Sequence, residues 1–118
     1  MATTTFYGLA ACDACRRARK WLDGHGLDYT IHDVRSHGLP AELTVRWAGS
    51  VGWDALINRR SRTWRELGAA GQSRAKSEPA MLLADHPTLL KRPLLESGGD
   101  VAVGFDAERW SRCLGLAR

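Results

Sequence analysis

The sequence predicts an α/β domain in which helices pack against one mixed β-sheet. The first third of the chain has a β-α-β pattern, and the last third has a β-hairpin followed by a helix. A β-α-β unit aligns its two strands in parallel, whereas a hairpin pairs its strands antiparallel. Because the residues between these two parts favour helices, we expect a mixed four-stranded sheet with an inserted helical segment, all within a single domain of residues 1–118.

The β-α-β pattern begins with a short strand over residues 4–9, whose first residues are β-branched and aromatic. A helix is expected over residues 13–24, because glycines favour its termination and its apolar residues share one face. These apolar residues are Ala14, Ala18, Trp21 and Leu22. Residues 27–34 then alternate between apolar and polar side chains, which is typical of a β-strand.

The middle of the chain is predicted to be helical and broken. Pro40 stands near the start of one helix, where its missing N–H costs least, and Leu43 and Trp47 are spaced to share the buried face of that helix. A short helical turn is expected at residues 53–57, and residues 79–85 are interpreted as the apolar end of another helix.

The last third contains two short apolar runs, residues 94–96 and 101–103, which flank the turn-forming segment 97–100. This pattern predicts a β-hairpin with a four-residue turn. Asp106 is placed to cap a final helix, whose buried face is expected to include Trp110.

The composition is that of an ordinary globular domain, with 118 residues of which 44% are hydrophobic and 25% charged. No uncharged stretch approaches the roughly 18 apolar residues that a membrane-spanning helix needs. The first residues lack the basic and apolar segments of a signal peptide, so we expect a cytoplasmic location and no membrane partner. The formal net charge of +4 comes mostly from arginine, which suits small anionic partners and does not by itself indicate nucleic acid.

Two of the three cysteines form the motif Cys12-Asp13-Ala14-Cys15, which lies where the first predicted strand gives way to the first helix. Free backbone N–H groups and the helix dipole stabilise an anion at a helix N-terminus. A thiolate at Cys12 therefore has a lowered pKa and is a good nucleophile. Cys15 lies one turn later, close enough to attack a mixed disulfide on Cys12. The motif predicts a redox-active pair with Cys12 as the nucleophile.

Two other interpretations of the motif stay open. The pair could be half of a zinc site, but a structural zinc ion needs four ligands and no second Cys or His pair has suitable spacing, so we expect no metal. The cysteines could also be inert, and Cys15 could be a packing residue if the mechanism uses Cys12 and an external thiol. Cys113, in the last predicted helix, is interpreted as a small core residue.

Around the Cys12-Asp13-Ala14-Cys15 motif the chain resembles the arsenate-reductase-like (ArsC/Spx/YffB) family of the thioredoxin superfamily, and most of all its small YffB-type branch. The resemblance covers nearly the whole chain and is most specific in residues 53–67 and 91–95. It implies a thioredoxin-like fold and a thiol-disulfide oxidoreductase, in particular a glutathione-dependent thiol reductase. The implied partners are glutathione as co-substrate or a protein thiol or disulfide, with no bound cofactor.

The resemblance also implies the residues of the site. Cys12 matches the catalytic cysteine of the family, Arg92 matches an arginine beside the active site, and Pro93 matches the cis-proline that faces the cysteine. Arg60 matches an arginine of the YffB and Spx branches. We therefore expect Cys12, Cys15 and Arg92 to act in catalysis, and Arg60, Arg92 and Pro93 to bind the substrate, the arginines holding carboxylates by charge-assisted hydrogen bonds.

Departures from the family pattern bear on the other functions. The arsenate reductases hold arginines at positions where this chain has Asn58 and Gly104, which makes arsenate reduction the least favoured function. The second cysteine, Cys15, is unusual for the YffB-type branch and resembles the Spx regulators, which use such a pair as a redox switch while bound to RNA polymerase. An Spx-like redox-sensing regulator is therefore the alternative.

Overall fold

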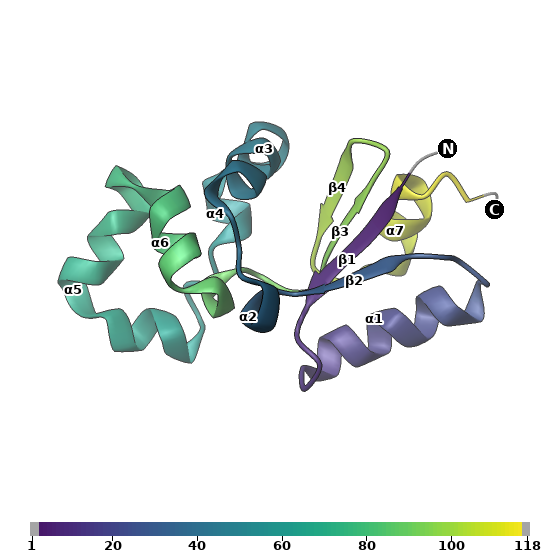
Figure 1. The fold of residues 1–118 in the computed structure, drawn as a ribbon, viewed down its shortest axis with the longest axis horizontal. Coiled ribbons are helices and arrows are strands. Elements are labelled where there is room, and N and C mark those ends of the chain that lie inside the picture. Colours follow the sequence, from purple (N-terminus) through teal and green to yellow (C-terminus); the bar gives the residue numbers. More distant parts are fainter. Residues whose placement is uncertain (1–2, 117–118) are drawn as a thin grey trace. The chain divides into compact units, whose positions relative to one another are not determined.

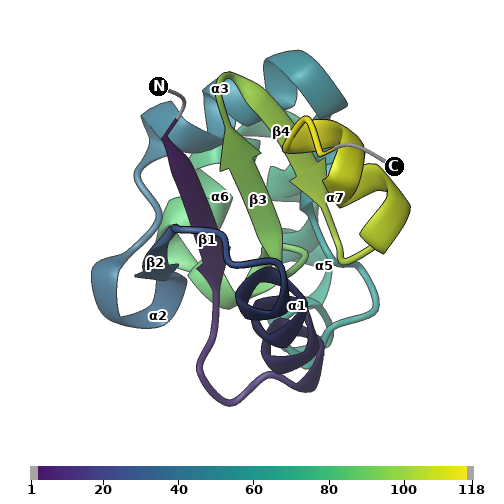
Figure 2. The same ribbon diagram turned by 90° about the vertical axis from the view of Figure 1, so that its right-hand side faces the viewer.

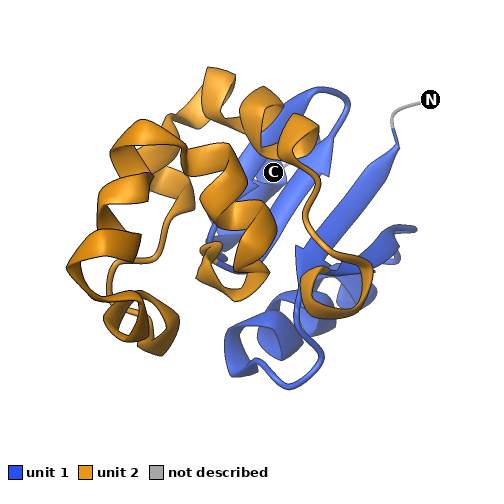
Figure 3. Cartoon of the chain, turned by 60° about the vertical axis from the view of Figure 1, so that its left-hand side comes forward, with its two compact units in different colours: residues 1–33, 92–118 blue, residues 34–91 orange. Residues whose placement is uncertain are grey.

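The computed structural model describes residues 3–116, and the chain divides into two compact units (Figure 3). Unit 1 consists of residues 1–33 and 92–118, and unit 2 consists of residues 34–91. Unit 2 is thus a continuous insertion between the two parts of the chain that make unit 1. It contains all of the middle helices, which confirms the inserted helical segment that the sequence predicts.

Unit 1 contains a four-stranded sheet in the order β2-β1-β3-β4 (Figure 1). Its strands are β1 (Thr4–Gly8), β2 (Thr30–Asp33), β3 (Leu94–Ser97) and β4 (Asp100–Val103). The central strand β1 pairs in parallel with β2 and antiparallel with β3, and β3 pairs antiparallel with β4. The sheet is therefore mixed, as the combination of a β-α-β unit and a hairpin predicts.

Two helices cover one face of this sheet, α1 (Asp13–Gly24) and α7 (Ala107–Cys113), as Figure 2 shows. The helix α1 has the bounds that the sequence predicts. The Asp106 side chain caps α7 by accepting a 2.9 Å hydrogen bond from the N–H of Arg109, as expected. The core between helices and strands is built from Phe6, Cys15, Ala18, Leu22, Leu95, Ala102 and Trp110.

Unit 2 is built from short helices. They are α2 (Val34–His37), α3 (Ala41–Val51), α4 (Trp53–Leu56), α5 (Arg62–Ser77), α6 (Pro79–Asp85) and the 3₁₀ turn η1 (Pro87–Leu89). Helix α5 is kinked at Gly68, whose φ of 69° lies in the region that favours glycine. An antiparallel bridge between Ile57 and Leu90 ties the end of α4 to the end of the unit. The N–H of Lys91 reinforces it by donating to the carbonyl of Leu56 at 2.7 Å.

The structure differs from the predicted elements in three places. The second strand covers only Thr30–Asp33 of the expected residues 27–34, and α2 begins directly after it at Val34. The hairpin turn has two residues rather than four: Gly98 and Gly99 have φ angles of 58° and 90°, which allow a tight turn that extends the strands up to it. In α3, Thr44 is buried and Leu43 only half-buried. Across residues 3–116, none of the helices has the length and apolar character needed to cross a membrane.

Candidate active site

Cys12 occupies the N-cap of α1. Its backbone is extended, with φ of −88° and ψ of 125°, and its carbonyl accepts the first helical hydrogen bond, from the N–H of Arg16 at 2.9 Å. The side chain is half-buried and the thiol is free. Cys12 therefore stands at the end of the helix where N–H groups without helical partners favour a negative charge.

Several groups around Cys12 favour its thiolate. Burial alone would raise the pKa of Cys12, but the surrounding groups outweigh burial and the pKa is lowered. These groups are the backbone N–H and the thiol of Cys15, the positive charge of Arg92 and the backbone N–H of Ala14. A lowered pKa raises the fraction of the nucleophilic thiolate at neutral pH.

Cys15 has the opposite character. It is only 1% exposed, and its sulfur accepts a long hydrogen bond, 3.5 Å, from the N–H of Leu9. Burial raises the pKa of Cys15 to about 11, and the hydrogen bond to Cys12 and the negative charge of that residue add to the rise. At neutral pH the Cys15 thiol is therefore protonated, and it stabilises the negative charge on Cys12 by donating a hydrogen bond to the Cys12 sulfur.

Strand pairing brings Arg92 and Pro93 to the same end of unit 1 as Cys12. In the antiparallel pairing of β1 with β3, Tyr7 lies opposite Leu94, so the start of β3 lies beside the end of β1, just before the loop to Cys12. The charge of Arg92 lowers the pKa of Cys12, which places the guanidinium within electrostatic reach of the sulfur. Pro93 is buried.

The peptide bond between Arg92 and Pro93 is cis, which confirms the prediction from the resemblance. The carbonyl of Pro93 accepts a 2.7 Å hydrogen bond from the N–H of Gly104. The carbonyl of Gly104 in turn accepts a 2.8 Å hydrogen bond from the indole N–H of Trp110, which is fully buried. The backbone at Pro93 is therefore connected to the core of unit 1.

Arg60 belongs to unit 2 and is exposed. Its backbone N–H donates to the side chain of Asn58 at 3.0 Å, and its carbonyl accepts from Arg65 at 3.1 Å. The role of Arg60 in binding stays a prediction. Cys113 is half-buried against the core of unit 1, and burial, together with the charge of Asp100, raises the pKa of its thiol.

Two further positions shape the site and were not singled out as site residues from the sequence. They are Leu9, through its backbone N–H, and Gly8, which lies against the sulfur of Cys15. A glycine at the end of the strand that precedes a Cys-x-x-Cys motif is the signal that points to such a close approach. Among residues 3–116, no group of three or more His, Cys, Asp and Glu side chains is arranged to hold a metal ion.

Comparison with known proteins identifies the family of the chain. The ArsC family model matches residues 7–113. The chain belongs to the ArsC family. A relative from Haemophilus influenzae, named only as an uncharacterized protein, is 36% identical over 107 residues, covering 90% of this chain and 94% of the relative. The global transcriptional regulator Spx 2 of Bacillus cereus is 27% identical over 104 residues, covering 86% of this chain and 79% of the regulator.

A solved structure of a protein named YFFB has the same fold, with a TM-score of 0.89 and 35% identity, covering 95% of this chain and 99% of that one. The ArsC-family chain thus has the predicted α/β fold, a mixed four-stranded sheet with helices, and shares it with that structure.

Proposed function

We propose that this ArsC-family protein is a thiol-disulfide oxidoreductase that uses glutathione as its reductant, with Cys12 as the nucleophile. The observation that carries the proposal is the environment of the Cys12 sulfur. It combines a helix N-terminus, the protonated thiol of Cys15 and the charge of Arg92. An environment that stabilises a thiolate is what a nucleophilic cysteine requires, whereas an inert cysteine has no need of it.

The proposed reaction begins when the Cys12 thiolate attacks the glutathionyl sulfur of a mixed disulfide. A new disulfide forms between Cys12 and glutathione, the original S–S bond breaks, and the substrate leaves as a thiolate that takes a proton from water. A second glutathione thiolate then attacks the glutathionyl sulfur on Cys12, which releases oxidised glutathione and the Cys12 thiolate. The net reaction converts the mixed disulfide and one glutathione thiol into the substrate thiol and oxidised glutathione, so one S–S bond is broken, one is formed, and one free glutathione thiol is consumed.

Cys15 and Arg92 have separate proposed roles in these steps. The buried thiol of Cys15 stabilises the Cys12 thiolate when that thiolate departs, because a hydrogen bond to the charged form lowers its pKa. When glutathione is disulfide-bonded to Cys12, a deprotonated Cys15 can also attack the Cys12 sulfur, which forms the Cys12–Cys15 disulfide and releases glutathione as a thiolate. Arg92, with Arg60 as a second candidate, holds the carboxylates of glutathione, since a guanidinium fork matches a carboxylate.

The experiment is a coupled assay with glutathione, glutathione reductase, NADPH and a small glutathione mixed disulfide. We expect turnover by the wild-type protein, loss of turnover in Cys12→Ser, and retention in the matched control Cys113→Ser, which removes a thiol of raised pKa. A wild-type rate equal to the uncatalysed background would overturn the proposal.

The second candidate function is an Spx-like redox-sensing regulator that binds RNA polymerase and performs no turnover. The observation that favours it is the pair of free thiols, Cys12 and Cys15. The alignment with the Spx 2 regulator of Bacillus cereus covers 86% of this chain. Binding to RNA polymerase that depends on whether the pair is oxidised, together with no turnover of glutathione mixed disulfides, would favour this function.

Arsenate reduction has less support. Gly104, at the position where the resemblance places an arginine of the arsenate reductases, has a φ of 75°. This backbone conformation is strained for any residue with a side chain. The carbonyl and N–H of Gly104 are both used in hydrogen bonds that connect Pro93 to Trp110. Gly104 therefore uses its backbone to connect Pro93 to Trp110, and it has no side chain that could bind an oxyanion.

A further inference from the structure

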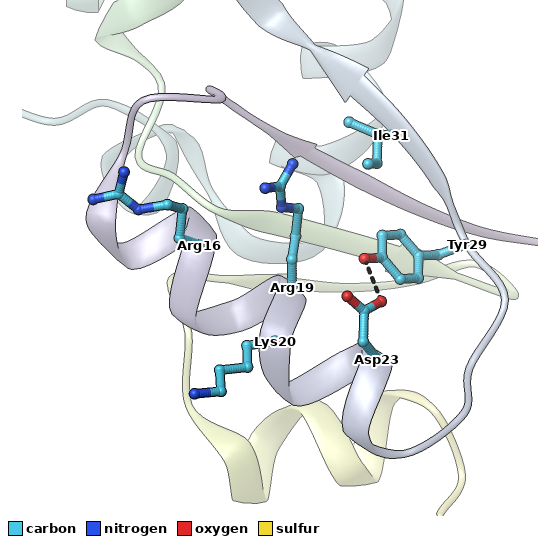
Figure 4. A pocket seen from close by; sticks show the side chains of 6 residues that line it. All are labelled: Arg16, Arg19, Lys20, Asp23, Tyr29 and Ile31. Atoms are coloured by element: carbon cyan, nitrogen blue, oxygen red, sulfur yellow. Dashed lines mark hydrogen bonds between the residues drawn. The ribbon is translucent and has the colours of Figure 1, made fainter.

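A basic pocket lies along α1 beside the edge strand β2, within unit 1 (Figure 4). Its volume is about 450 Å³. The residues that line it are Arg16, Arg19, Lys20, Asp23, Tyr29 and Ile31. The helical residues are spaced three and four apart, so they share one face of α1. We propose that this pocket docks an acidic segment of a protein whose cysteine reacts at Cys12.

The charges of the pocket are mostly positive and partly uncompensated. Arg16 is paired with Asp13, and the Asp23 carboxylate accepts a 2.9 Å hydrogen bond from the Tyr29 hydroxyl. Within residues 3–116, Arg19 and Lys20 have no ion-pair partner. Arg19 is half-buried and reaches from the helix toward the strand, beside Tyr29 (Figure 4). A guanidinium held in this way is available to a carboxylate.

The other lining residues favour a protein segment over a free small anion. Ile31 is 48% exposed although it is a large apolar residue, and Tyr29 contributes an aromatic side chain to the lining. Arginine and tyrosine are enriched at the centres of protein interfaces, where an apolar contact accompanies a few charged ones. The pocket therefore offers an apolar contact as well as charge to a peptide chain that crosses it.

The distance between the pocket and Cys12 determines which residues of a partner protein can enter the pocket while its cysteine reacts at Cys12. Arg16 lies one helical turn after Cys12, about 6 Å along the axis, and Arg19 lies about 10 Å along it. An extended peptide spans roughly 3.3 Å per residue. A partner whose cysteine is attacked at Cys12 can therefore place an Asp or Glu two to four residues away in the pocket. This inference rests on the proposed thiol reductase function and names its substrate class as proteins with acidic residues near the reactive cysteine.

The test compares two cysteine peptides, each carrying glutathione as a mixed disulfide. One peptide has Asp and Glu two to four residues from its cysteine, and the other has Asn and Gln there. We expect the wild-type protein to reduce the acidic peptide with a kcat/KM roughly 3- to 10-fold higher, as expected for a few exposed charge pairs, and the preference to shrink as salt is added. Equal kcat/KM values for the two peptides would overturn the docking site.

Matched variants localise the effect. Arg19→Glu is expected to abolish or reverse the preference for the acidic peptide. Arg17→Glu makes the same change of charge at an exposed residue of α1 that does not line the pocket, and it should retain the preference. If both variants lost the preference for the acidic peptide equally, the overall positive charge of α1 would explain the preference, and the pocket would be excluded as the docking site.

Binding without chemistry separates this proposal from the reductase function. If neither peptide is reduced, the proposed function fails, but the pocket can still be judged by titrating the reduced protein with cysteine-free versions of the two peptides. We expect ¹H–¹⁵N shift changes at Arg19, Lys20, Tyr29 and Ile31 with the acidic peptide only. No change with that peptide, or the same changes with glutathione alone, would overturn the assignment to a protein segment.

Discussion

A β-carbon on Gly8 would lie 2.7 Å from the sulfur of Cys15. It would also lie 2.9 Å from Cε1 of Phe6, which belongs to the core of unit 1. Carbon atoms do not approach neighbouring heavy atoms so closely, so the strand β1 can pass this close to Cys15 only with a glycine at its end. Gly8 therefore determines how deeply the second cysteine of the motif is buried.

Replacing Gly8 with alanine should consequently destabilise the fold. We expect Gly8→Ala to lower the free energy of unfolding by about 1–3 kcal/mol, the usual cost of overpacking a core, measured by urea denaturation. Gly24→Ala is the matched control, because no atom lies within 4 Å of a β-carbon at that position. In Gly8→Ala/Cys15→Ala the two losses should be less than additive, since the second change removes the clashing sulfur. Equal stability of Gly8→Ala and Gly24→Ala would contradict this explanation.

The lowered pKa of Cys12 predicts how its alkylation depends on pH. Iodoacetamide reacts with the thiolate, so the alkylation rate of Cys12 should rise with pH and level off above the pKa of Cys12. This pKa lies below the ordinary thiol value of 9.0, so the rate should level off at a lower pH than for an ordinary cysteine. Cys113, whose pKa is raised, should react more slowly at neutral pH. The rates can be followed by mass spectrometry of the separated peptides.

Removing the groups that stabilise the Cys12 thiolate should move this profile to higher pH. We expect such a shift in Arg92→Gln and in Cys15→Ala, because each removes a favourable interaction with the charged sulfur. Arg17→Gln, which changes charge elsewhere on α1, is the control. One common pH profile for all three cysteines of the wild-type protein would contradict an activated Cys12.

Cys12 and Cys15 should form a disulfide under mild oxidation. Their thiols interact directly, and residues one helical turn apart can reach the Cα separation of roughly 4.4–6.8 Å that a disulfide needs. Tryptic digestion leaves both cysteines in the peptide that ends at Arg16, so its mass should fall by two hydrogens. If oxidised glutathione gives only glutathionylated Cys12, then Cys15 is not a resolving thiol and its role is to stabilise the thiolate.

Arg92 is expected to matter for turnover and little for folding. Loss of one charge-assisted contact costs about 1.5–3 kcal/mol, so Arg92→Ala should lower kcat/KM for glutathione roughly 10- to 100-fold. Lys91→Ala, the neighbouring cation, which donates to the carbonyl of Asp54, should have a small effect. Comparable losses in both variants, or a large loss of thermal stability in Arg92→Ala, would remove Arg92 from the proposed binding role.

Some features of this protein follow from local sequence alone. Helix α1 has its expected bounds because its signals are local: apolar residues at helical spacing and glycines at its end. The place of Cys12 at the helix N-terminus follows from the same signals. Local patterns predict the hairpin, but its turn is shorter than predicted, because Ser97 and Asp100 look like turn residues and pair as strand residues. The cis bond before Pro93 came from the family resemblance.

Other features depend on contacts between distant parts of the chain. The pairing of β1 with β3 brings Arg92 beside Cys12 although 80 positions separate them, and local patterns do not encode which strands become neighbours. The two cysteines of one motif acquire opposite pKa shifts because packing against Gly8 and Leu9 removes water from Cys15 and leaves Cys12 at the helix end. Local sequence signals place the two thiols on the helix, whereas their opposite pKa shifts come from the folded structure, because the exclusion of water depends on every element that packs around them.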